Sequence, residues 1–124
     1  MDILNKSTIG KDRFSEHSLR EWLPVVVGCI VEKFNPVSII VFGSVVRNED
    51  GPDSDLDLLV VFDEVERSEI IRLMGKVRRA ISLPIPCDVI VTDLNEYDLK
   101  KNVNGSALYW PAHEGEIIYE RIAS

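Results

Sequence analysis

The chain has 124 residues, of which 45% are hydrophobic and 28% charged, and its formal net charge is −7 at pH 7. This length fits one domain with a single core, and the apolar content excludes a disordered protein. The acidic excess repels phosphate backbones, so we do not expect non-specific nucleic-acid binding. No apolar run approaches the length of a membrane span, and the N-terminus lacks the order of a signal peptide, which favours a cytoplasmic protein.

The N-terminal part is expected to be a mobile segment, residues 1–14, ahead of a single domain spanning residues 15–124. The first predicted element is a helix that begins with the capping box Ser18-Leu-Arg-Glu21. Its apolar residues recur at helical spacing as far as Phe34. Asn35-Pro36 ends it, because the residue before a proline avoids helical geometry.

Apolar runs predict strands at about residues 37–42, 56–62, 87–92 and 116–120. A dense turn cluster, Asn48-Glu-Asp-Gly-Pro-Asp-Ser54, separates the first two strands. With the helices between them, these strands predict an α+β protein of two layers. Its mixed sheet has about four strands, and the helices pack on it.

An amphipathic helix is predicted over residues 68–81, capped by Ser68 and ended by Pro84 and Pro86. Asp93 with Glu96 indicates another short helix start. Residues 101–115 are predicted to hold one more helical turn, broken near Pro111 and closed at Gly115. We expect the basic residues of the 67–79 segment on a solvated face, with a docking surface as the alternative: Arg67, Arg72, Lys76, Arg78 and Arg79.

Cys29 and Cys87 lie in apolar contexts, and we expect two buried thiols rather than a disulfide. No histidine has ligand spacing from them, which excludes a zinc site. His113 is expected in an exposed loop, with substrate contact as the alternative. Tyr109 and Trp110 are expected to pack in the core or against a partner, with stacking on a base as the alternative.

The most informative pattern is Gly43-Ser44, ten residues, then Asp55-Leu-Asp57. Because side chains alternate along a strand, Asp55 and Asp57 point to one side while Leu56 points into the core. Asp88 opens the third predicted strand and completes a carboxylate set if that strand lies beside the second. Carboxylates and phosphate oxygens are the ligands Mg²⁺ prefers, and two ions could clamp both oxygens of an in-line displacement at phosphorus.

The Gly-Ser turn offers groups that suit a phosphate. Gly43 lets the backbone approach closely, Ser44 offers a hydroxyl and an N–H, and Arg47 could neutralise phosphate charge through its planar guanidinium. Competing motifs fail: no Gly-Lys-Ser or Gly-Lys-Thr of a P-loop is present, and Leu58 stands where an EF-hand starting at Asp53 needs glycine. Neither histidine has the context of a hydrolase triad.

Together these features resemble the DNA polymerase β-type nucleotidyltransferase superfamily, and most closely its minimal nucleotidyltransferases. Arg47 falls in that family's Gly-Ser-x-x-Arg pattern, and Ser54-Asp-Leu-Asp57 reproduces its Ser-Asp-x-Asp stretch. Gly115-Glu-Ile-Ile-Tyr-Glu120 is similar to the Gly-x-x-x-Tyr-Glu ending of these small proteins. The resemblance covers about residues 18–120.

The resemblance implies a Mg²⁺-dependent adenylyltransferase, which transfers AMP from ATP to an acceptor hydroxyl and releases pyrophosphate. It implies that Asp55, Asp57 and Asp88 hold two ions and that Asp88 also helps to activate the acceptor. The residues implied in nucleotide binding are Gly43, Ser44, Arg47 and Ser54.

Many minimal nucleotidyltransferases are encoded beside a small helical HEPN protein and act as its antitoxin, some by transferring AMP to a tyrosine. The resemblance therefore implies a separate HEPN-family partner, and a homodimer is a further expectation because the segment Tyr109-Trp-Pro111 is apolar. Two alternatives stay open. One is a non-catalytic antitoxin that neutralises the toxin by binding, and the other is a nucleotidyltransferase acting on an aminoglycoside-like small molecule.

Overall fold

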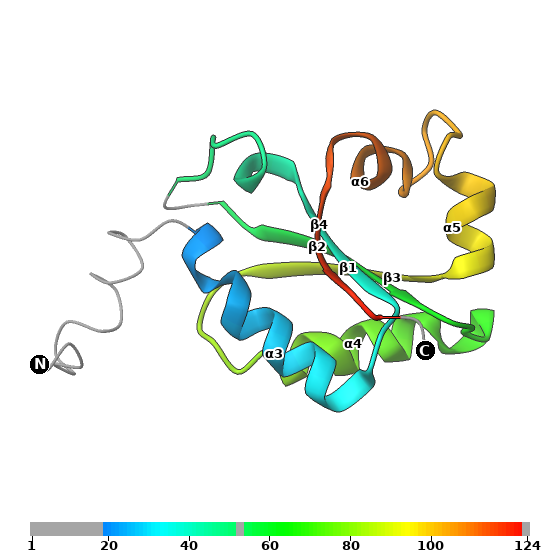
Figure 1. Cartoon of the computed structure of the whole chain (residues 1–124), viewed down its shortest axis with the longest axis horizontal. Coiled ribbons are helices and arrows are strands. Elements are labelled where there is room, and N and C mark those ends of the chain that lie inside the picture. Colours follow the sequence, from blue (N-terminus) through cyan, green and yellow to red (C-terminus); the bar gives the residue numbers. More distant parts are fainter. Residues whose placement is uncertain (1–18, 52–53, 123–124) are drawn as a thin grey trace, which may run out of the picture.

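The computed structural model describes residues 19–51 and 54–122, which form a mixed β-sheet flanked by helices (Figure 1). The strands are β1 (Ser38–Phe42), β2 (Leu56–Phe62), β3 (Cys87–Asp93) and β4 (Glu116–Glu120), in the order β3-β2-β1-β4. β1 pairs antiparallel with both β2 and β4, whereas β2 and β3 run parallel. The predicted α+β class with a mixed sheet of about four strands is confirmed.

Helices lie on both faces of this sheet (Figure 1). One face is covered by α3 (Leu23–Phe34) and α4 (Ile70–Ala80), and the other by α5 (Leu94–Lys100) and α6 (Tyr109–Glu114). Short 3-10 turns precede α3, follow β1 and precede α4: η1 (Leu19–Trp22), η2 (Gly43–Val45) and η3 (Arg67–Glu69).

Alternation along β2 divides its side chains between two apolar clusters. Leu56, Leu58 and Val60 are fully buried and pack in the cluster under α3 and α4. Leu59 and Val61 belong to a smaller cluster on the opposite face, which includes a residue just before α6. Because both faces are covered, β2 is apolar at nearly every position, and its one carboxylate falls on the side of α5 and α6.

The first helix differs from the prediction at its start. α3 begins only at Leu23, and Pro24 lies in its first turn, where the missing N–H removes no helical hydrogen bond. Ser18 and the predicted mobile segment 1–14 lie outside the described residues. The predicted end is confirmed: Asn35 adopts a left-handed conformation with φ 48°, and its N–H donates to the carbonyl oxygen of Val31.

The prediction that Ser68 caps the next helix is wrong. Ser68 lies within η3, and Glu69 occupies the N-cap position of α4 without a side-chain cap bond. A cap residue is only a local signal in the sequence. In this structure the backbone forms the 3-10 turn η3 before α4 begins. The helix ends at Ala80, one residue before the predicted limit.

The predicted helix start at Asp93 is confirmed. Asp93 Oδ1 accepts a hydrogen bond from the Glu96 N–H at 2.9 Å, and Oδ2 accepts one from the Val65 N–H at 3.0 Å. These two bonds favour the ionised carboxylate and hold the pKa of Asp93 below its ordinary value. The cap therefore joins α5 to the loop that follows β2.

α6 contains Pro111 and is not broken by it, contrary to the prediction. Pro111 lies in the first turn, where a backbone N–H has no partner within the helix. Gly115 ends α6 as predicted, because its backbone is extended. A Cβ there would clash with the carbonyl oxygen of Pro111 and with the side chain of Ile40. The close approach to β1 fixes the last residue of α6, Glu114, beside the end of that strand.

Other expectations hold in part. Cys29 and Cys87 are free thiols as expected, but only Cys87 is buried. Burial raises the pKa of the Cys87 thiol to about 11. The basic residues of the 67–79 segment are exposed, as expected for a solvated face. Among the described residues, no helix has the length and apolar character needed to cross a membrane.

Candidate functional site

The register of the parallel pair β2 and β3 brings two predicted site carboxylates side by side. Asp57 on β2 is the partner of Asp88 on β3. Both lie on the face covered by α5 and α6, because Leu59 and Ile90, two residues further along each strand, pack in the cluster on that face. Asp55 lies one residue before β2 and is exposed, as is Asp88, whereas Asp57 is half-buried.

Partial burial and the neighbouring carboxylates change the pKa of Asp57. Its burial raises its pKa, and the nearby charges of Asp88, Asp55 and Glu114 raise it further, while Arg47 acts in the opposite direction. Crowded carboxylates of this kind favour a bound cation, which offsets their repulsion.

The fit of these residues to Mg²⁺ rests on their chemistry. Carboxylate oxygens are the donors that Mg²⁺ prefers, with substrate phosphate completing its coordination. Within residues 19–51 and 54–122, no group of three ligand side chains already converges closely enough to hold a metal ion. Metal binding by Asp55, Asp57 and Asp88 stays a prediction.

Gly43 lies directly against Asp57. Its φ is +83°, a conformation that favours glycine, and a Cβ there would clash with a carboxylate oxygen of Asp57. The residue before it, Phe42, is the register partner of Asp57 on β1. Both the turn and the neighbouring carboxylate therefore require glycine at this position.

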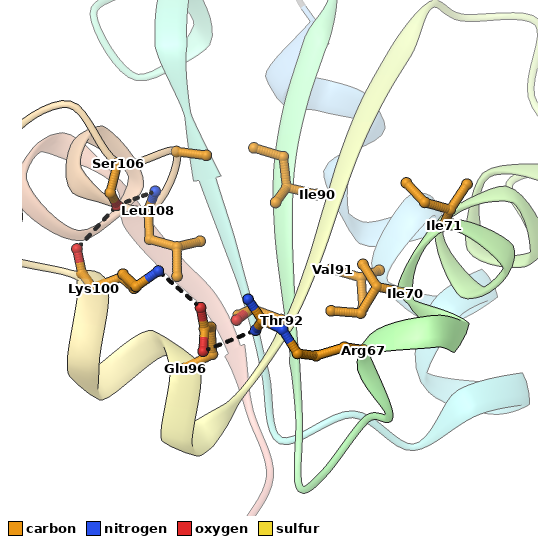
Figure 2. A pocket seen from close by; sticks show the side chains of 11 residues that line it. Arg67, Ile70, Ile71, Ile90, Val91, Thr92, Glu96, Lys100, Ser106 and Leu108 are labelled. Carbon is orange, nitrogen blue, oxygen red and sulfur yellow. Dashed lines mark hydrogen bonds and ion pairs between the residues drawn. The ribbon is translucent and has the colours of Figure 1, made fainter.

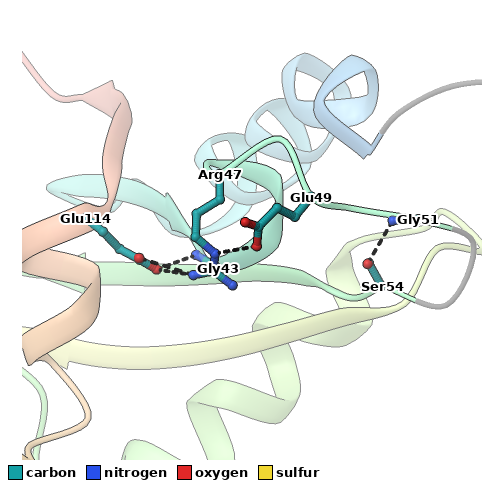
Figure 3. A network of polar contacts seen from close by, with 6 residues as sticks. All are labelled: Gly43, Arg47, Glu49, Gly51, Ser54 and Glu114. Carbon is teal, nitrogen blue, oxygen red and sulfur yellow. Dashed lines mark hydrogen bonds and ion pairs between the residues drawn. The ribbon is translucent and has the colours of Figure 1, made fainter.

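Glu114 is not among the site residues predicted from the sequence, yet its carboxylate lies at the centre of the polar contacts (Figure 3). Its Oε1 accepts hydrogen bonds from the Gly43 N–H at 3.2 Å and from Arg47 Nη1 at 2.9 Å. Its Oε2 accepts from the same Nη1 at 3.1 Å, while Arg47 Nε donates to Glu49 at 2.9 Å. One carboxylate thus engages two of the groups that were predicted to bind phosphate.

The two predicted serines differ in their surroundings. The Ser54 hydroxyl accepts a hydrogen bond from the Gly51 N–H at 2.9 Å, directly before Asp55 (Figure 3). Ser44 is half-buried within η2, and its carbonyl oxygen accepts from the Glu49 N–H. Nucleotide contacts by Ser44 and Ser54 stay predictions.

The loop after η2 is tied to the start of the first helix. Asp50 Oδ2 accepts from the Leu19 N–H at 3.2 Å, and Arg20 Nη2 donates to the carbonyl oxygen of Val45 at 3.4 Å. These long-range bonds fix both ends of the segment that carries Arg47.

An open groove of about 460 Å³ lies along the edge strand β3, between α4 and residues 106–108 (Figure 2). Its wall carries a linked set of charges, because Glu96 pairs with Arg67 at 3.4 Å and with Lys100 at 3.2 Å. Ile90, which lines the groove, follows Asp88 by two residues on the same side of the strand, roughly 6.6 Å away. The other lining residues are largely apolar or neutral and come from three segments: Ile70, Ile71, Val91, Thr92, Ser106, Ala107 and Leu108.

The aromatic residues of α6 form a separate group. His113 lies on this helix and not in the predicted loop, although it is exposed as expected. Its ring stacks on Tyr109 with centroids 4.1 Å apart, and its Nε2 is 3.0 Å from Asn102 Oδ1. Trp110 is 60% exposed and so is not a core residue. Stacking on a base and a homodimer contact at this segment both stay predictions.

A comparison with known proteins decides the family. The family model described as "Nucleotidyltransferase domain" matches residues 24–122 of the chain. The chain belongs to this nucleotidyltransferase family. The predicted resemblance is thereby confirmed at that level, and identity as an antitoxin-type minimal nucleotidyltransferase stays a prediction.

A solved structure supports the fold of this nucleotidyltransferase domain. A candidate nucleotidyltransferase from Sulfolobus solfataricus, a crystal structure at 1.40 Å resolution, superimposes with a TM-score of 0.60. The alignment covers 98% of this chain and 94% of that chain at 20% sequence identity, so the likeness concerns the fold alone. No curated protein matches the chain.

Proposed function

We propose that this nucleotidyltransferase domain transfers AMP from ATP to an acceptor hydroxyl and releases pyrophosphate. The observation that carries the proposal is the pairing of Asp57 with Asp88 in register, with Gly43 against Asp57 and Arg47 nearby. Carboxylates suited to a cation thus lie next to donors suited to an anion. A magnesium–nucleotide complex needs this combination.

In this proposal the acidic residues hold the metal ion, and the hydrogen-bond donors hold the phosphates. Asp55, Asp57 and Asp88 would hold Mg²⁺, which when bound neutralises charge on the transferred phosphate. The Gly43 N–H and the Arg47 guanidinium would hold the β- and γ-phosphates, because both present hydrogen-bond donors to the same small region.

The acceptor oxygen would form a bond to the α-phosphorus while the bond from that phosphorus to its bridging oxygen breaks. Pyrophosphate leaves with the electron pair of the broken bond. The acceptor hydroxyl would lose its proton to the carboxylate of Asp88, which is exposed. Ile90, which lines the groove, follows Asp88 on the same side of β3, and this proximity supports the assignment.

A side chain of another protein is the acceptor that we favour, in a partner of the HEPN class. The groove is open and combines apolar residues with the charged set Arg67, Glu96 and Lys100, which suits a hydroxyl-bearing side chain presented by a second protein surface. A small-molecule hydroxyl is the other acceptor class, and the location of transferred label distinguishes the two.

Neutralisation of a partner by binding alone is the second candidate. The occupation of the Gly43 and Arg47 donors by Glu114 favours it, because a site used only as a binding surface has no need to leave these groups free. Under this hypothesis, loss of the carboxylates would not affect the action on the partner.

The test is labelling by α-³²P ATP with Mg²⁺ in a lysate of the source cell. We expect a labelled protein with the wild-type chain and none with the Asp55→Ala/Asp57→Ala double variant. Asp98→Asn is the control, since this exposed residue of α5 pairs with Lys101, just after the end of that helix, and does not lie on the strands that carry the site. Label confined to a small molecule would exclude the protein acceptor. An absence of label in both fractions, with partner binding retained, would reject transfer and favour binding alone.

A further inference from the structure

We infer that Glu114 sets the nucleotide affinity of the site, because its carboxylate occupies in the free protein the donors that the triphosphate needs. The inference rests on the proposed function, since it takes Gly43 and Arg47 as phosphate-binding groups. It assigns to Glu114 the part of an internal competitor that the nucleotide must displace.

At the Gly43 N–H, Glu114 and a phosphate oxygen are mutually exclusive, and at Arg47 they compete for the same guanidinium. A backbone N–H has a single hydrogen, and that of Gly43 already donates to Glu114 Oε1 at 3.2 Å. Arg47 Nη1 contacts both oxygens of the same carboxylate, at 2.9 and 3.1 Å. Two anionic oxygens bridging an amide and a guanidinium are the arrangement that a phosphate would make there (Figure 3).

The position of Glu114 allows it to be displaced. It is the last residue of the short helix α6, and its side chain is 24% exposed. Its backbone is fixed by the close packing of Gly115 on β1, so only the side chain has to rotate. In its observed position the carboxylate adds negative charge beside Asp57, where the triphosphate would add more. Like-charge repulsion therefore favours its departure when the nucleotide arrives.

A purely structural role would have a different consequence. If the Glu114–Arg47 pair served only to join α6 to the loop after η2, neutralising Glu114 would weaken that contact without improving anion binding. An internal competitor instead predicts a gain in affinity when its charge is removed. Nucleotide affinity thus separates the two roles, whereas stability does not.

The experiment titrates the non-reacting analogue α,β-methylene-ATP with Mg²⁺ into the wild-type chain and into Glu114→Gln. Calorimetry gives the dissociation constant, and the amide signal of Gly43 in ¹H–¹⁵N spectra reports on the site itself. We expect roughly tenfold tighter binding by the variant, the size of one lost charge-assisted hydrogen bond. Glu116→Gln is the matched control: it removes the same charge two residues away, where Glu116 pairs with Arg20 at 3.1 Å.

Equal or weaker binding by Glu114→Gln would overturn the inference and leave the proposed function standing. A similar gain in Glu116→Gln would also overturn it, because total charge would then explain the effect. If no variant binds the analogue and the Gly43 signal does not move, the proposed function fails and the inference with it. Should Glu114→Gln not fold, Glu114→Asp carries the test with a smaller gain, since it retracts the carboxylate by one methylene.

Discussion

The Asp57 carboxylate packs directly against Gly43, in the volume that a side chain at position 43 would fill. The two residues meet because β1 and β2 pair antiparallel, with Phe42 opposite Asp57. The turn that offers an N–H to an anion and the strand that offers a carboxylate to a cation are therefore built against each other.

Gly43→Ala should damage both folding and binding. A side chain there meets a positive φ and the Asp57 carboxylate, so we expect a loss of about 2 kcal/mol in the free energy of unfolding and a weaker affinity for nucleotide. Urea unfolding measures the loss. Gly28→Ala is the control, since a Cβ on that helical glycine contacts nothing, and should leave the protein as stable or slightly more stable. Equal stability of both variants would refute the close packing of Gly43 and Asp57.

Asp57→Asn should stabilise the protein when divalent cations are removed by EDTA. The pKa of Asp57 is raised in the folded state by its burial and by Asp88 and Asp55. The folded chain therefore holds this proton more tightly than the unfolded chain, and the free energy of unfolding falls as pH rises through the pKa of Asp57. We expect a higher free energy of unfolding near pH 7 for the variant than for the wild-type chain.

The control for this gain is Asp98→Asn, which removes a charge from an exposed ion pair and should change the free energy of unfolding by less than about 0.5 kcal/mol. Thermal unfolding from pH 4 to pH 8 follows both variants. A loss of stability in Asp57→Asn at pH 7 would show that the carboxylates do not repel one another in the folded state.

Asp93 should stabilise α5 in two separable ways. Asp93→Ala removes the N-cap and leaves the Glu96 and Val65 N–H groups without their acceptor, at a cost of about 1 kcal/mol. Asp93→Asn keeps a cap and removes the charge. Because the pKa of Asp93 is lowered on folding, the contribution of the charge is present above the unfolded pKa and is lost as pH falls through the folded pKa.

The measurement is urea unfolding of the wild type and Asp93→Asn from pH 7 down to the acid limit of folding. We expect the difference in free energy of unfolding to shrink steadily as the pH falls below about 4. If the difference in free energy of unfolding stayed constant over this pH range, the charge of Asp93 would not contribute to the stability of the cap.

Cys87 should resist thiol reagents in the folded protein. It is 5% exposed, and burial raises its pKa to about 11, so little thiolate forms at pH 8. In the Cys29→Ser variant, which leaves Cys87 as the remaining thiol, we expect labelling by Ellman's reagent to be about a hundredfold slower than in urea. Fast labelling of the folded variant would place Cys87 at the surface.

Local patterns in the sequence predicted much of the fold. The strand limits follow from apolar runs, and the Asp93 cap follows from a carboxylate three residues before an N–H that needs an acceptor. Ser68 also has the residue type of an N-cap, but the prediction that it caps α4 is wrong, because the chain forms the turn η3 before α4 begins. The sequence predicts that Pro111 breaks the helix, but a proline in the first turn is compatible with α6.

The candidate site also contains residues that the sequence predicts and one whose contacts it does not predict. The Gly-Ser turn and the Asp-x-Asp pair are close in sequence and could be found there, and Asp88 followed once β3 was assumed to lie beside β2. The contacts of Glu114 with Gly43 and Arg47 could not be predicted, since they span 71 and 67 residues. Its position directly before Gly115 was the available signal, and no periodicity links that position to the turn after β1.

The most direct test of the proposed site uses Mn²⁺ in place of Mg²⁺ together with α,β-methylene-ATP, because a bound paramagnetic ion broadens the amide signals around it. We expect selective broadening at Asp57, Asp88 and Gly43 in the wild-type chain and its loss in the Asp57→Asn/Asp88→Asn double variant. Broadening centred elsewhere, or broadening that persists unchanged in the double variant, would contradict a metal–nucleotide site at the paired ends of β2 and β3.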